Sequence, residues 1–553
     1  MKARIGLLVL ILALSASLSV AQSLGWWASP WAGSFRKAST AGLLEDDLDL
    51  MLDPARLPLI EGNRLYTNLS NLVSKNDDVF DNTSNGYYLL GGSGKIMDYG
   101  YAGLLYDRHL DRQYDTTISS GTVYVDNDAN GTYDVKTQVN TTTYSGNQYK
   151  YTDWWIGYGR DLGPGKFGVL FYHSVNNEHD QPSCTDSKTT VTDVVTGAVT
   201  NETAAKTNIS NQLNTSANGG ALTYWYPFND KIDLGLAGGI RINKAEVIDS
   251  IVYAQHSLDP SAPGTNGTTV DSTATSDHIP WDHIGMNLIG RVAGVYKWSD
   301  KVKTRTDIYF TTLVGGKKDD GFQKSTYHSL VAFQVPTGTQ ATDINRILNA
   351  TVVQEDHNST VGITSNTFVK FSDKVEMAIG LGLDSYNRDY TTTVNGTFNN
   401  TVTYNDGIAT NQTAAYDLYQ STDNTIKQVQ MHTEAGLAIS TPVCVEFHIT
   451  KPFVFRLGAT HVFDYWNYTD NQTQEVTPLV TTSTDGYGVV TQTKPTPYTS
   501  ANGASDYEKR AESYMNYTYG AGWEISKNLQ IDLMGFAQLD NMANWKLSAI
   551  FKF

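Results

Sequence analysis

The sequence is poor in the features on which soluble enzymes and nucleic-acid-binding proteins depend. Only 18% of its 553 residues are charged, and 40 Lys and Arg stand against 57 Asp and Glu, which gives a net charge of -17. We therefore expect no nucleic acid as a partner, because phosphate backbones attract basic surfaces. The 11 His are scattered, and no HExxH, GxSxG or Cys/His zinc spacing occurs. The sequence thus predicts no catalytic residues and no enzyme.

Long apolar runs are also missing after the N-terminus. Lys2 and Arg4 precede an apolar core at residues 5–14, and Ser19-Val20-Ala21 places small residues where signal peptidase cleaves. We interpret residues 1–21 as a cleaved secretory signal. No later run approaches the roughly 18 apolar residues that a spanning helix needs. Any membrane-spanning part of the mature chain must therefore consist of strands.

The C-terminal stretch has the periodicity of strands. From Trp545 to Phe553 every second residue is apolar, so these side chains fall on one face of an extended chain. Residues 529–539 alternate in the same way, and the polar turn between the two runs predicts an antiparallel hairpin. A final strand that ends in an aromatic residue resembles the signal read by the barrel assembly machinery of the outer membrane. The residues that carry this resemblance are Lys546, Ser548, Phe551 and Phe553.

From residue 64 onward, short turns alternate with long polar tracts. The turns at 228–232, 298–302, 371–375 and 525–529 each join two alternating runs of about ten residues, which is the length that a tilted strand needs to cross a bilayer. Short turns at one end and long connections at the other are typical of outer-membrane barrels. We expect six long extracellular loops, at 108–150, 177–217, 244–284, 315–360, 387–426 and 465–512.

The number of strands follows from counting back from the C-terminus. Fourteen runs are clear, and a further pair at 64–72 and 86–92, followed by a glycine-rich turn at 91–94, would make sixteen. The predicted fold is all-β: a transmembrane antiparallel up-and-down β-barrel of 14–16 strands with long extracellular loops and a small N-terminal plug. Its predicted parts are the signal peptide (1–21), the plug segment (22–62) and the outer-membrane barrel (63–553).

Residues 22–62 show no strand alternation. After three tryptophans come the small residues 41–42, the acidic run 45–47 and the element Asp53-Pro54-Ala55-Arg56. This order resembles the N-terminal region of the long-chain fatty-acid transporter (FadL-type) superfamily, where an Asn-Pro-Ala-Gly-like element precedes the first strand. Asp53 and Arg56 depart from that element. The resemblance implies a plug inside the barrel, with a short periplasmic helix and linker as the alternative. The plug residues would include Glu45, Asp46, Asp47, Asp53 and Pro54.

The lumen of so large a barrel is too wide to be filled by its own inward side chains. The alternation places charged residues of both signs on the inner face, where they could hold the acidic N-terminal segment through charge-assisted hydrogen bonds. The predicted lumen residues are Arg291, Arg305, Asp307, Glu376, Glu524 and Asp532.

Residues 126–134 resemble a calcium-binding loop. Oxygen-bearing side chains stand at loop positions 1, 3, 5 and 9, and Gly stands at position 6, where a sharp turn is needed. The twelfth position is Thr137 instead of a bidentate Glu, and an Asn-Gly hairpin turn explains the same residues equally well. No other cofactor is predicted. The candidate calcium ligands are Asp126, Asp128, Asn130, Thr132 and Asp134.

Taken together, these features favour a channel or transporter in the outer membrane of a diderm bacterium. It would take up small solutes passively, and hydrophobic solutes are the favoured of two classes. The expected partners are outer-membrane lipids, the barrel assembly machinery and the small-molecule solute. One alternative is a structural or secretion-associated barrel that binds a partner through its loops. A second is an outer-membrane hydrolase with its site at the rim.

Overall fold

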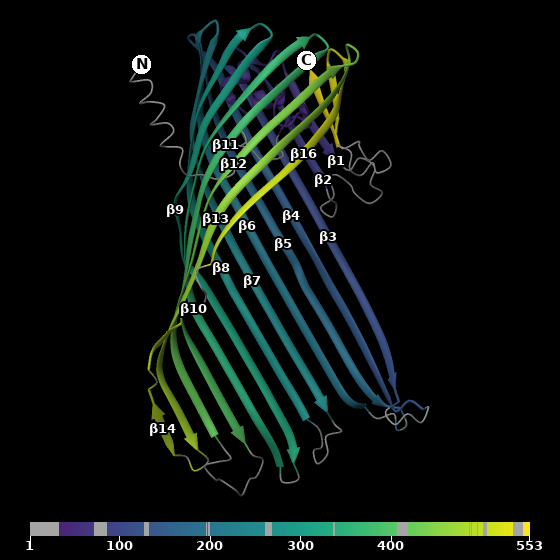
Figure 1. The fold of residues 1–553 in the computed structure, drawn as a ribbon, viewed down its shortest axis with the longest axis vertical. Coiled ribbons are helices and arrows are strands. Elements are labelled where there is room, and N and C mark those ends of the chain that lie inside the picture. Colours follow the sequence, from purple (N-terminus) through teal and green to yellow (C-terminus); the bar gives the residue numbers. More distant parts are fainter. Residues whose placement is uncertain are drawn as a thin grey trace.

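A computed structural model describes residues 33–70, 86–126, 132–194, 196, 199–259, 268–335, 338–405, 418–485, 487, 489–494, 496–500, 506–534 and 546–553. The predicted signal peptide and residues 22–32 lie outside this part of the chain. The strands form one antiparallel sheet that curls into a tall barrel (Figure 1). β1 (Arg64–Ser70) pairs with both β2 and β18, which closes the sheet. None of the helices in the described ranges is long and apolar enough to cross a membrane.

Among the described residues, sixteen of the eighteen strands form the barrel wall, in agreement with the larger of the two predicted counts. The other two, β14 (Val490–Thr493) and β15 (Tyr498–Ser500), are short and pair with β13. The strands that follow β1 in the wall are β2 (Gly86–Ile96), β3 (Gly100–Val125), β4 (Val135–Leu162), β5 (Gly165–Asp193), β6 (Val199–Asn229), β7 (Ile232–Asp259), β8 (Thr268–Ser299), β9 (Val302–Val335), β10 (Gly338–Ser372), β11 (Val375–Asn405), β12 (Leu418–His448), β13 (Phe453–Asp485), β16 (Asp506–Ser526), β17 (Leu529–Met534) and β18 (Lys546–Lys552).

The predicted alternation is confirmed in the half of the wall next to the short turns. Leu236 of β7 and Ile379 of β11 point outward and are 56% and 61% exposed. On the inner face of β9, Arg305 and Asp307 are buried. An apolar outer surface on a closed sheet is suited to lipid, because closure pairs the backbone groups that lipid cannot satisfy. The chain is therefore a barrel of the membrane-spanning type.

The six tracts predicted as loops are largely strand. β9 and β10 have 34 and 35 residues, and their pairing continues through most of the tract 315–360. Outside a bilayer both faces of a strand can be polar, so hydrophobic periodicity disappears although Thr and Val still favour extended backbone. The predicted turn at 91–94 was also wrong. β2 continues to Ile96, and the chain reverses at residues 97–99.

The N-terminal segment, residues 33–60, lies inside the barrel at the end of the short turns (Figure 1). It consists of α2 (Phe35–Ser39), α3 (Asp47–Met51) and the 3-10 helix η1 (Pro54–Leu59). η1 packs on β3 to β6, and α2 packs on β13, β16 and β17. Met51 and Leu57 are buried in one apolar cluster with Trp155 of β4. Burial of each such side chain stabilises the docked segment by roughly 1.5–3 kcal/mol.

Candidate functional site: the lumen at the short turns

Glycines in the wall make room for the N-terminal segment. A Cβ atom at Gly159 of β4 would overlap the carbonyl oxygen of Pro54, and one at Gly168 of β5 would overlap the backbone nitrogen of Ala55. The inner wall can therefore accept the backbone of η1 only because these two strands carry no side chain at the contact. Pro54, a predicted plug residue, thus lies directly against the wall.

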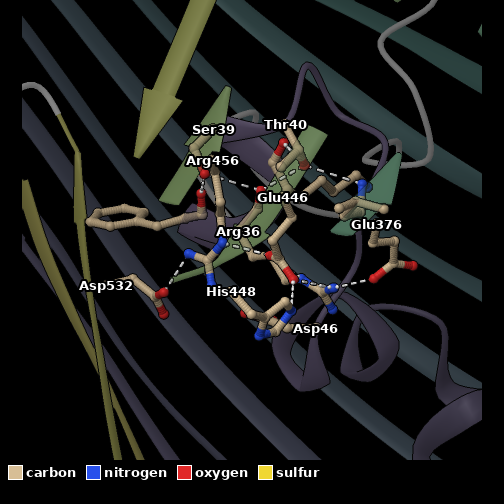
Figure 2. Close-up of polar contacts among 12 residues, drawn as sticks. Arg36, Ser39, Thr40, Asp46, Glu376, Glu446, His448, Arg456 and Asp532 are labelled. Carbon is tan, nitrogen blue, oxygen red and sulfur yellow. Dashed lines mark hydrogen bonds and ion pairs between the residues drawn. The ribbon is translucent and has the colours of Figure 1, made fainter. Parts of the chain in front are cut away.

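A first group of ion pairs joins α2 to β11, β12, β13 and β17 (Figure 2). Arg36 donates from Nε to Glu446 and from Nη2 to Glu376, both at 3.0 Å. Glu446 also accepts from Nε of Arg456 at 2.8 Å, and Arg456 contacts Asp532. Glu446, Arg456 and Asp532 are almost fully buried. Removal of Arg456 would therefore take from the buried Asp532 the guanidinium group that it contacts, which is costly in a dry environment.

A second group of ion pairs centres on Glu45. Its carboxylate accepts from Arg56 of the same segment at 2.8 Å and from Nη1 of Arg305 in β9 at 3.0 Å. Burial alone would raise the pKa of Glu45, but the charges of Arg56 and Arg305 hold it well below its usual value. Glu45 is therefore ionised and ties the segment to the wall.

Asp53 extends this second group to β6 and β8. It accepts from the indole nitrogen of Trp225 at 2.8 Å and lies 3.4 Å from Nη1 of Arg291. Arg291 in turn contacts Asp307 at 2.8 Å. The guanidinium groups of Arg56, Arg291 and Arg305 all lie 5.7 to 5.8 Å from the centre of the Trp225 ring. Trp225 is thus the aromatic centre of a basic cluster.

The other two predicted plug residues belong to α3. Asp46 caps this helix by accepting from the backbone nitrogen of Leu48, and Asp49 closes a capping box. Burial and the neighbouring Asp49 raise the pKa of Asp46 well above its usual value. Asp47 accepts from Nε of Arg64 at 2.6 Å, at the start of β1.

Five of the six predicted lumen residues lie in these networks. Glu524 does not, because its carboxylate is half exposed at the rim, 3.8 Å from Lys552. Arg36, Glu446 and Arg456 were missed by the sequence reasoning. The register places Glu446 opposite Arg456 in β12 and β13, so cross-strand charge pairing would have been the signal for these two.

The residues of the predicted assembly signal are all in or next to β18. Ser548 is buried on the inner face opposite Asp532, whereas Phe551 and Phe553 point outward and are 38% and 67% exposed. Lys546 pairs with Met534 in the register. The terminal Phe553 exchanges two backbone hydrogen bonds with Asn63, which precedes β1. The recognition of this strand by assembly machinery stays a prediction.

Two of the candidate calcium ligands, Asp128 and Asn130, lie outside the described residues. The other three are Asp126, Thr132 and Asp134, at the β3–β4 reversal, where the nitrogen of Asp134 donates to the carbonyl of Val125 at 2.9 Å. Among the described residues, no group of three or more His, Cys, Asp or Glu side chains could hold a metal ion. The calcium site stays a prediction.

Three cavities border the middle of the N-terminal segment, and one of them, about 540 Å³, lies beside Asp46 and Glu446. The other two adjoin each other. The mouth cavity, about 600 Å³, opens near the short turns, with Pro164 and Lys297 in its lining. The inner cavity, about 320 Å³, lies further along β9 and β11, beside Tyr309 and Asp384. The partition between the two is formed by side chains that line both: Leu43, Glu45, Arg305 and Phe368.

No protein-family model and no curated protein matches this chain. Among solved structures it is similar to the CymD monoaromatic hydrocarbon channel, at 10% identity and a TM-score of 0.30 over 81% of this chain and 98% of that one. A FadL homologue from Pseudomonas aeruginosa has 12% identity, a TM-score of 0.22 and coverage of 97% and 100%. The toluene transporter TbuX from Ralstonia pickettii has 12% identity, a TM-score of 0.21 and coverage of 80% and 98%. The architecture described here therefore rests on the strand pairings of this chain itself.

Proposed function

We propose that this protein is a passive channel of the outer membrane, in which the N-terminal segment acts as a plug that restricts the lumen. The observation that carries the proposal is the partition between the mouth and inner cavities. The same four residues, Leu43, Glu45, Arg305 and Phe368, line both cavities and so stand between them. A structural barrel needs no such pair of adjoining cavities, whereas a channel with a restricted path does.

The plug is held in the barrel by ion pairs and by apolar contacts. Arg36, Glu45 and Asp53 each pair with residues of the wall. Leu43 and Leu44 pack against Ala378 and Cys444 of the wall. A small movement of residues 43–45 would join the two cavities without undocking α2 or η1. Solute passage therefore requires no release of the whole segment.

Hydrophobic solutes remain the favoured class. The lining of the mouth cavity includes apolar side chains from both the segment and the wall, among them Leu50, Leu59, Trp225 and Phe368. Water leaves such surfaces readily when an apolar solute enters. The charged residues around them would orient a solute and not exclude it, because most of them already pair with one another.

Two assays test the proposal. The first is swelling of liposomes that contain the purified barrel, with small sugars as solutes. The second is uptake of toluene by a bacterium whose outer leaflet slows hydrophobic solutes, with and without the protein. We expect entry in at least one assay and the larger effect in the second. A barrel that shows heat-modifiable migration yet admits no solute in either assay would be the partner-binding alternative.

A further inference from the structure

We propose that the mouth cavity binds small organic anions, each consisting of a carboxylate on a ring-sized apolar body, through the ammonium group of Lys303. This inference rests on the proposed channel function and names a solute class for it. The inference starts from Lys303, whose ammonium group has no carboxylate in ion-pair contact among the described residues. The cavity around it has apolar side chains and charged side chains that pair with one another.

Lys303 is the second residue of β9 and faces the mouth cavity. Its Nζ lies 5.2 Å from the centre of the Phe368 ring. No carboxylate of the described residues lies within ion-pair distance of this Nζ, whereas Lys297 in the same cavity contacts Asp233 at 2.8 Å. A cation held only over an aromatic face keeps its hydrogen-bond donors available to a ligand.

Six basic residues and the three carboxylates of Glu45, Asp233 and Glu376 line the cavity. Each of these carboxylates is already within 3.0 Å of a basic partner. Three of the basic residues that line the cavity pair with carboxylates outside its lining, namely Arg36 with Glu446, Lys166 with Asp161 and Arg305 with Asp307. The charges of Glu376 and Glu45 act on Lys303 from beyond ion-pair distance. An incoming anion therefore meets an ammonium group that no carboxylate of the described residues contacts directly. The six basic residues are Arg36, Arg56, Lys166, Lys297, Lys303 and Arg305.

The apolar part of the lining determines what kind of anion fits. Phe368 lies beside the Lys303 ammonium group, and Leu43, Leu44 and Trp225 also contribute apolar surface to the lining of the cavity. A volume of about 600 Å³ is within the range of small-molecule sites. Inorganic phosphate or chloride would pair with Lys303 but leave the apolar side chains in contact with water. A carboxylate attached to a ring would use both, with its charge at Lys303 and its ring against the apolar residues.

Calorimetry on the detergent-folded protein at pH 8 tests the inference, with benzoate as the probe and benzyl alcohol as its neutral counterpart. We expect benzoate to bind more tightly than benzyl alcohol or phosphate. Lys303→Met should weaken benzoate by about tenfold, as expected for the loss of a charge-assisted hydrogen bond, and leave benzyl alcohol unchanged. Lys303→Arg should retain the binding of benzoate.

Lys297→Gln is the matched control, because it removes the same charge from the same cavity but from a lysine that is already paired. An equal loss of benzoate in Lys297→Gln and Lys303→Met, or no loss in Lys303→Met, would overturn the inference. Heat-modifiable migration of each variant establishes that it is folded. If benzoate binds but the barrel admits no solute, the proposed channel function is wrong and the anion site stands. If solutes enter but benzoate does not bind, the anion site is wrong and the channel function stands.

Discussion

Glu45 of the N-terminal segment and Arg305 of β9 form an ion pair across the partition, with 3.0 Å between Oε1 and Nη1. The two residues are 260 positions apart in the sequence. Arg305 also contacts Asp307 of its own strand at 2.9 Å. The same guanidinium group thus pairs with one acid of the plug and one of the wall, and it links residues 43–45 to the barrel in addition to the packing of Leu43 and Leu44.

Replacing Arg305 should open the partition. In Arg305→Met, Glu45 and Asp307 would each lose one of two basic partners, since Glu45 keeps Arg56 and Asp307 keeps Arg291. The cost should therefore be less than the ~3–5 kcal/mol of a buried charge left wholly unpaired. We expect residues 43–45 to move away from the wall and single-channel conductance to rise several-fold in planar bilayers. Glu524→Gln is the control, since Glu524 is half exposed at the rim and its ion pair is with Lys552 of the wall. If the conductance of Arg305→Met equals that of the control, Arg305 does not hold residues 43–45 in place.

Acid should weaken the docking of the plug. Since the folded-state pKa of Glu45 lies well below its usual value, its ion pairs contribute stability that is complete above the unfolded pKa. That stability is lost as the pH falls through the folded value. A protease added from the short-turn side should therefore cleave the segment faster at strongly acidic pH than at neutral pH. In Glu45→Gln this component of the pH dependence should be gone, and its persistence would show that other groups control docking.

Ionisation of Asp46 should weaken the docking of the plug, whereas ionisation of Glu45 strengthens it. Its pKa is raised by burial and by Asp49, so at neutral pH its ionised form opposes docking. Asp46→Asn keeps an acceptor for the backbone nitrogen of Leu48 and remains a good N-cap. We expect slower proteolysis of the segment in this variant at neutral pH. The advantage over the parent should shrink at low pH, where Asp46 is protonated. Faster proteolysis of Asp46→Asn than of the parent at neutral pH would show that ionised Asp46 does not oppose docking.

The wall glycines offer a steric test of docking. Gly168→Ala places a methyl group where Pro54 and Ala55 now lie. We expect η1 to be displaced and the segment to become accessible to protease. Gly238→Ala in β7 is the matched control, because the nearest atom to its added Cβ is 3.9 Å away. If the segment is cleaved equally slowly in both variants, the contact between η1 and the wall is not needed for docking.

The C-terminal aromatic should matter for assembly more than for stability. Phe553 is 67% exposed, so Phe553→Ala removes little packing from the folded barrel. If the assembly machinery reads this residue, the heat-modifiable fraction in the outer membrane should fall several-fold in Phe553→Ala. Phe371→Ala, which removes a comparably exposed aromatic residue at 59%, should leave that fraction unchanged. Equal losses in both would indicate a general effect of surface aromatics.

Much of the wall could be predicted because lipid imposes a strict alternation. In β7, β9 and β11 the apolar residues near the short turns face outward and the charged ones inward, and this pattern is visible in the sequence alone. The distal halves of the same strands carry polar residues on both faces, so no periodicity distinguished them from loops.

The contacts of the plug were harder to predict than its composition. The acidic run 45–47 indicated a charged partner, but three adjacent acids make contacts of different kinds. Glu45 pairs with Arg305, Asp46 caps α3, and Asp47 pairs with Arg64. Only the path of the chain inside the barrel decides between these roles. Arg36 was missed for the same reason, because its partners Glu376 and Glu446 are brought together by the pairing of β11 with β12.

The central claim is that the N-terminal segment restricts the lumen, and its most direct test is the single-channel conductance of a variant that lacks residues 24–58. Removal of α2, α3 and most of η1 would merge the mouth and inner cavities and empty the space between the inner walls. We predict a conductance much larger than that of the parent, measured in planar bilayers at the same salt concentration. A parent channel that is already wide open, with a conductance unchanged by the deletion, would contradict the account and leave a porin without a plug.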